Sequence, residues 1–154
     1  MLVHVPLTVG DFLQRAALVF PDRVAVVDEP GVAGALGSLT YAEVHARARG
    51  MAATLDRMGV AHGERVAIVS PNAAKFLVAF FGVSGWGRTL VPVNFRLNTE
   101  EVAYIVEHSG ASVLLVDPEY DAALAGVTAK HRIVLDGVAD AELFAALGDA
   151  DPPA

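Results

Sequence analysis

Residues 65–97 contain the feature that most restricts how this chain can fold: two short apolar runs on either side of an apolar helical segment. Residues 66–69 (VAIV) show no alternation of polar and apolar side chains, which is typical of a parallel strand covered on both faces. A Ser-Pro-Asn turn follows, and its Asn72 is a candidate cap for a helix over residues 73–85. Residues 89–93 (TLVPV) form the next candidate strand. The stretch therefore predicts a β-α-β unit, with a right-handed crossover, at the centre of an α/β sheet.

The helix predicted over residues 73–85 carries apolar side chains all around its axis, among them Phe76, Phe80 and Phe81. A helix of this composition is expected to be buried on most sides. The sequence therefore predicts that it is the most buried helix of the chain.

The remaining sequence alternates between further helices and strands. Two capping boxes stand out, Thr40 with Glu43 and Asn98 with Glu101, each typical of a helix start. Strands are expected at residues 23–28, 38–39, 112–116 and 131–135, and helices at 9–19, 41–58, 98–109 and 140–147, with a short one near 117–119. The first two strands are interpreted as an antiparallel hairpin at the sheet's edge. The fold class is then α/β: a mainly parallel sheet with helices on both faces, in a single domain over residues 1–147, followed by a linker-like tail over residues 148–154.

The amino-acid composition limits the classes of partner and the cellular compartment that can be expected for this chain. The 154 residues suit one domain, and a hydrophobic fraction of 54% excludes disorder and exceeds what a small domain needs for its core. The excess indicates apolar surface for a partner and leaves homo-oligomer formation open. A formal charge of −7 without a basic cluster argues against nucleic acid and anionic membranes. The absence of cysteine excludes disulfides, and the N-terminus lacks the pattern of a signal peptide, so a cytoplasmic location is expected.

No complete active site is visible in the sequence. Gly82, Gly85 and Gly87 have nearly the spacing of a nucleotide-binding loop, but they fall at a helix C-terminus, where helix termination and close packing explain them better. The five histidines show no metal-ligand spacing, and no G-x-S-x-G nucleophile motif is present. We therefore predict no catalytic residue and no metal site in this chain.

Several stretches, read in order, carry a family resemblance. They are LTYAEV (39–44), GERVAIVSPN (63–72), GWGRTLVPVNFRL (85–97) and EEVAYIVEHSGASVLLVD (100–117). Together they resemble the N-terminal segment of the adenylate-forming superfamily, which comprises acyl-CoA synthetases, firefly-type luciferases and peptide-synthetase adenylation domains. The similarity is greatest to fatty-acid and related acyl-CoA synthetases. One departure is the Trp-Gly-Arg at residues 86–88, where the family usually has Ala-Gly-Ala or similar.

The resemblance implies a parent enzyme that joins ATP and a fatty acid or related carboxylate to an acyl-adenylate and then transfers the acyl group to coenzyme A. The family's phosphate loop, magnesium-binding glutamate and mobile C-terminal domain would lie beyond Ala154. The chain would then be an N-terminal subdomain, inactive and without a bound cofactor by itself, whose partner is the missing remainder. ATP, Mg²⁺ and CoA would belong to the parent, which could also contact a membrane peripherally. A stand-alone binding domain and a fragment of a different adenylate-forming enzyme remain as alternatives, and the acyl chain length is not determined.

One loop is a candidate substrate contact. Asn94, Phe95 and Arg96 follow the strand at residues 89–93, and ligands of open α/β sheets bind beyond the carboxyl ends of the strands. The resemblance implies that this segment approaches the pantetheine channel, so the loop would line the acyl or coenzyme A path, with Arg96 as a cation for a phosphate. The alternative is purely structural: a turn shaped by Asn94, a core Phe95 and an Arg96 paired with an acid at the start of the next helix.

Overall fold

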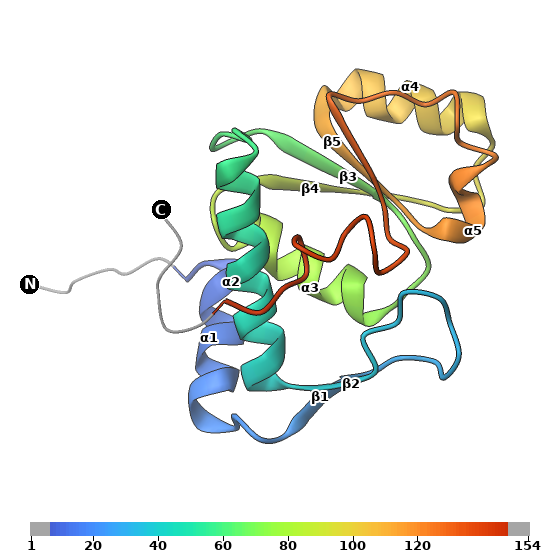
Figure 1. Ribbon diagram of the computed structural model, residues 1–154. Helices are drawn as coiled ribbons and strands as arrows, with labels where there is room; N and C mark the ends of the chain where they lie inside the picture. Colours follow the sequence, from blue (N-terminus) through green and yellow to red (C-terminus); the bar gives the residue numbers. More distant parts are fainter. Residues whose placement is uncertain (1–6, 148–154) are drawn as a thin grey trace, which may run out of the picture.

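The computed structural model of the chain describes residues 7–147 and places a four-stranded parallel sheet at its centre (Figure 1). The strand order is β4-β3-β5-β6. The strands are β3 (Arg65–Val69), β4 (Thr89–Val93), β5 (Ala111–Val116) and β6 (His131–Val134). Each neighbouring pair runs parallel. The parallel sheet predicted from the unalternating apolar runs is thus confirmed. The tail predicted at residues 148–154 lies outside the described residues, and so does His4, one of the five histidines.

Helices cover both faces of this sheet, as predicted. On one face lie α1 (Val9–Val19), α2 (Tyr41–Arg57) and α3 (Ala74–Ser84), and on the other lies α4 (Thr99–Ser109) (Figure 1). The central strand shows why its sequence does not alternate. Val66 and Ile68 belong to the core that α2 and α3 share, whereas Ala67 and Val69 belong to the core under α4. Because both faces are buried there, the four positions after the exposed Arg65 are all apolar.

The two predicted capping boxes are present. The Thr40 amide donates to Glu43 Oε2 over 2.7 Å, and the Glu43 amide donates back to Thr40 Oγ1 over 3.3 Å. These bonds from Thr40, the backbone one foremost, lower the pKa of the Glu43 carboxyl. At α4 the corresponding bonds between Asn98 and Glu101 measure 3.0 and 2.9 Å. Gly110 then ends α4 in the left-handed conformation, at φ 64°.

The predicted antiparallel hairpin is formed by β1 (Val24–Val27) and β2 (Ser38–Thr40). It does not lie at the edge of the parallel sheet, as expected, but makes a two-stranded sheet of its own, and β4 and β6 are the edge strands of the four-stranded sheet. In β4, Pro92 stands opposite Ile68 of β3 and is exposed. None of the helices in the described part of the chain is long and apolar enough to cross a membrane.

The start of α3 differs from the prediction. The cap position is Ala73 rather than Asn72, and no side chain at that position bonds to the helix. Instead, the amide of Ala74 donates to Oδ1 of Asp28 over 2.6 Å. This buried carboxylate at the end of β1 therefore caps a helix that begins 46 residues later in the chain.

The expectation that α3 is the most buried helix is wrong. Phe80 is 40% exposed, and Phe76 and Phe81 are only partly buried. The reason is that small residues of α3 face α2: a Cβ added to Gly82 would lie 2.9 Å from Cβ of Met51. The longer α2 has the larger buried set: Val44, Ala48, Gly50, Met51, Ala52, Ala53, Thr54 and Leu55.

The prediction of a helix at residues 140–147 is also wrong, because this segment folds as successive turns. A few backbone bonds lie within the segment, such as that from the Phe144 amide to the Asp140 carbonyl, and others join it to α2. The Arg47 guanidinium donates to the Phe144 carbonyl over 2.6 Å, and the Leu147 amide donates to the Ala46 carbonyl over 3.0 Å. Gly50 permits this approach, since an added Cβ would lie 2.0 Å from the Ala145 oxygen. The segment thus runs across α2 (Figure 1, red). The helix that the structure shows between β5 and this segment is the short α5 (Pro118–Asp121).

Candidate functional site

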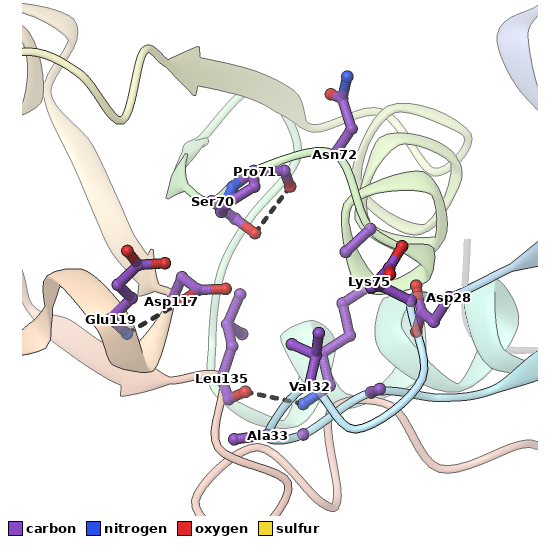
Figure 2. A pocket seen from close by; sticks show the side chains of 14 residues that line it. Asp28, Val32, Ala33, Ser70, Pro71, Asn72, Lys75, Asp117, Glu119 and Leu135 are labelled. Carbon is purple, nitrogen blue, oxygen red and sulfur yellow. Dashed lines mark hydrogen bonds between the residues drawn. The ribbon is translucent and has the colours of Figure 1, made fainter.

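A pocket of about 230 Å³ opens at the carboxyl ends of the central strands. Ser70 follows β3, Asp117 follows β5 and Leu135 follows β6, and all three line it (Figure 2). The remaining walls are the first turn of α3 and the loop between β1 and β2. This is the edge at which open α/β sheets bind ligands.

Lys75 is the cation that lines this pocket, and it forms an ion pair within the protein. The side chain is buried, and its ammonium group donates to Asp140 Oδ2 over 2.5 Å and to the Leu135 carbonyl over 3.0 Å. The ammonium also lies 5.3 Å from the ring centroid of Phe144. Asp140 in turn accepts a bond of 2.7 Å from the Gly137 amide. Lys75 therefore joins the C-terminal segment to α3, and its charge is already balanced by Asp140.

The second engaged group is Asp28. One carboxylate oxygen caps α3, and the other accepts a 2.7 Å bond from the amide of Leu36. Figure 2 shows Asp28 and Lys75 side by side at the first turn of α3. Neither residue was identified from the sequence, because their partners lie far away in the chain and leave no local pattern.

The glycine-rich loop at residues 29–37 does not resemble a phosphate cradle. It joins two antiparallel strands, whereas a phosphate loop leads from a strand into the N-terminus of a helix. Gly34 has φ 73°, and a Cβ there would lie 2.4 Å from the Leu135 oxygen. Gly34 therefore allows the backbone of this loop to lie close to the backbone at Leu135.

The other charged residues of the lining are all acidic. Glu29, Asp117 and Glu119 line the pocket, and Asp117 accepts a 3.0 Å bond from the Glu119 amide at the start of α5. Among the described residues, no group of three or more histidine or acidic side chains is arranged to hold a metal. The charged lining is therefore acidic apart from Lys75, which Asp140 pairs, and negative charge of this kind disfavours a triphosphate.

The predicted loop Asn94-Phe95-Arg96 lies at the carboxyl end of β4, and none of its residues lines the pocket. Asn94 Oδ1 accepts a 3.0 Å bond from the Arg96 amide, which closes a turn. Phe95 is partly buried against Tyr120, with ring centroids 5.5 Å apart. Arg96 is exposed, and its guanidinium carbon lies 5.5 Å from the Phe95 centroid.

Charges around this loop act on Tyr120. Burial, and after it the charges of Glu119 and Asp117, raise the pKa of the Tyr120 hydroxyl, which Arg96 lowers to a smaller extent. Within residues 7–147, Arg96 makes no ion pair with Glu100 or Glu101. The guanidinium is thus held near an aromatic surface at the sheet edge, with its donors toward solvent.

The unusual Trp-Gly-Arg has a structural role. Arg88 is buried and donates from Nε to the Val60 carbonyl over 2.9 Å, and it forms an ion pair with Asp56 at the end of α2. Gly87 has φ 73°, and a Cβ there would overlap the ring of His62. The glycines at 82, 85 and 87 thus serve packing and helix termination.

The chain was compared with known proteins and structures. Residues 13–153 match the family described as AMP-binding enzyme. A long-chain-fatty-acid–CoA ligase of Thermus thermophilus is 39% identical over 155 residues, which cover 95% of this chain and 28% of the ligase. A 4-hydroxybutyrate–CoA ligase of Metallosphaera sedula is 37% identical over 109 residues, covering 71% of this chain and 19% of the ligase. The chain therefore spans less than a third of the length of these relatives.

Solved structures give the same result. The N-terminal domain of FACL13 from Mycobacterium tuberculosis superposes with a TM-score of 0.83 at 30% identity, over 97% of this chain and 38% of that one. A fatty acyl-CoA synthetase of that organism superposes with a TM-score of 0.79 at 31% identity, over 96% of this chain and 30% of that one. The sheet, the flanking helices and the sequence thus agree: the chain belongs to the AMP-binding enzyme family and matches the N-terminal part of its CoA ligases.

Proposed function

We propose that this chain is the N-terminal subdomain of an AMP-forming acyl-CoA ligase, folded as a single domain over residues 1–147. The observation that carries the proposal is its coverage: 95% of the chain aligns with only 28% of a CoA ligase. The parent would convert a fatty acid or related carboxylate, ATP and CoA into acyl-CoA, AMP and pyrophosphate in the cytoplasm, as part of fatty acid metabolism. The acyl chain length stays open, since the relatives are named for substrates as different as long-chain fatty acids and 4-hydroxybutyrate.

The subdomain by itself is proposed to be inactive. Adenylate formation needs donors aimed at a triphosphate, and Lys75, the cation of the strand-end pocket, is already paired with Asp140. Residues 7–147 thus supply the parent with a rigid sheet edge, and the ATP and magnesium contacts belong to the remainder.

The test is pyrophosphate release from ATP. We expect the 154-residue chain to show no release dependent on a panel of acids from acetate to palmitate, and the longer protein to show it. Activity of the short chain would overturn the proposed inactivity. A longer protein that binds acyl groups without releasing pyrophosphate would favour a stand-alone binding domain instead.

Within the parent, we propose that Asn94, Phe95 and Arg96 line the acyl or coenzyme A path. The loop leaves the carboxyl end of β4, and its arginine is exposed with donors available for a phosphate. The turn made by Asn94 and the contact of Phe95 with Tyr120 fix the backbone from which Arg96 projects.

Replacing Arg96 with alanine in the parent should raise the apparent KM for CoA by about tenfold, because a hydrogen bond to a charged group contributes about 1.5–3 kcal/mol. Acyl-adenylate formation should remain nearly unchanged. Arg23→Ala is the matched control, since Arg23 is also exposed and lies 5.5 Å from an aromatic centroid, that of Phe20. If Arg96→Ala lowers both half-reactions together with the melting temperature, Arg96 is structural and the proposed path fails.

A further inference from the structure

An open apolar groove of about 610 Å³ lies between β1 and α3. Its apolar lining is Val26, Val27, Ala73, Phe76, Leu77 and Phe80. Val27 is 67% exposed and Phe80 is 40% exposed. We refer to these six residues as the α3–β1 groove.

The groove reverses the usual pattern of a surface helix. Val78, Ala79 and Val83 of α3 are fully buried in the core, yet the opposite side of the same helix is also apolar and carries its larger side chains. A surface helix of a monomeric domain would place polar residues there. Contiguous exposed apolar surface of this kind marks an interaction site.

One end of the groove is acidic. Asp28, Glu29, Asn72 and Ala73 line both the groove and the strand-end pocket, so the two hollows meet at the first turn of α3. Asp28 is occupied by two backbone amides, which leaves the exposed Glu29 as the carboxylate available to a partner. The groove thus fits an apolar segment with a cationic side chain at the end near Glu29.

We propose that the α3–β1 groove seats a later segment of the same polypeptide in the longer enzyme, an inference that rests on the proposed function. The length of the relatives supports this occupant over a second copy: this chain accounts for 38% of a domain that is itself only the N-terminal domain of a ligase. The groove residues are therefore an internal interface of the parent, and the aromatic face of α3 is core in the assembled enzyme.

Hydroxyl-radical footprinting of wild-type proteins tests the contact without any substitution. Phe76 and Phe80 should be oxidised in the 154-residue chain and protected in the longer protein. Leu18, which is 81% exposed on α1 and lies outside the groove, is the control and should be oxidised in both. Equal oxidation of Phe80 in the two proteins would overturn the proposal, as would a reading frame with no downstream segment.

A substitution separates this contact from the parent's activity. Phe80→Asp should lower the melting temperature of the longer protein by about 5 °C more than that of the 154-residue chain, in which Phe80 is 40% exposed. Leu18→Asp should change neither. If the short chain is a dimer that Phe80→Asp dissociates, the occupant is a second copy and the proposal is overturned. Absence of ligase activity with the footprint intact would reject the proposed function and leave the groove assignment standing.

Discussion

Replacing Asp140 with alanine should lower the free energy of unfolding of the chain by about 3–5 kcal/mol, because it leaves the buried ammonium of Lys75 without its counter-ion. Asp140 is 1% exposed and Lys75 is 5% exposed, so solvent cannot take the place of the lost carboxylate. The same change removes the acceptor of the Gly137 amide. Urea unfolding followed by circular dichroism measures the effect.

Two further variants make this result specific. Glu142→Ala lies in the same segment, is exposed, and should alter stability by less than about 0.5 kcal/mol. The double variant Lys75→Met with Asp140→Leu should recover most of the loss, because an apolar pair of similar volume removes the unpaired charge. A loss below about 1 kcal/mol in Asp140→Ala would mean that the ion pair does not hold the C-terminal segment on α3.

Asp28→Ala should destabilise the chain by about 2–4 kcal/mol, because two backbone amides, those of Ala74 and Leu36, lose their acceptor together. Asp28→Asn keeps one carbonyl oxygen and should give an intermediate loss. Glu29→Ala, at the exposed neighbouring position, is the matched control and should have little effect. The same unfolding experiment checks all three. If Asp28→Ala behaves like Glu29→Ala, the remote cap on α3 contributes nothing.

The parts of the fold that could be predicted from sequence are those with a local cause. The capping box of Thr40 and Glu43 acts over three residues, and the apolar runs of β3 and β5 reflect burial on both faces. The cap on α3 could not be predicted, because its acceptor Asp28 is 46 residues away. Asn72 is of a type that commonly caps a helix and lies next to the start of α3, but the contact with Asp28 caps the helix instead.

Tertiary contacts also explain the two other differences. Residues 140–147 have helix-forming composition, but Arg47 and Thr54 of α2 take the carbonyls of Phe144 and Glu142 that a helix would use. The all-round apolar character of α3 indicated burial, and the described structure buries only one side of it. A sequence shows that a face is apolar and does not show which part of the protein covers it.

For the candidate site, the rule for open α/β sheets predicted the edge of the sheet, and the pocket lies there. It did not identify the lining, because Lys75 and Asp140 are 65 residues apart and neither belongs to a motif. The assignment of Asn94, Phe95 and Arg96 to a substrate path stays a prediction.

The proline in β4 determines on which side the sheet can grow. Pro92 lacks the backbone N–H that a further strand would need, and prolines within sheets are confined to such edges. At the opposite edge, β6 carries no proline along His131–Val134, and its outer backbone groups can pair. A further strand would lose a backbone hydrogen bond at Pro92, so the edge at β6 is the more favourable one for extending this sheet.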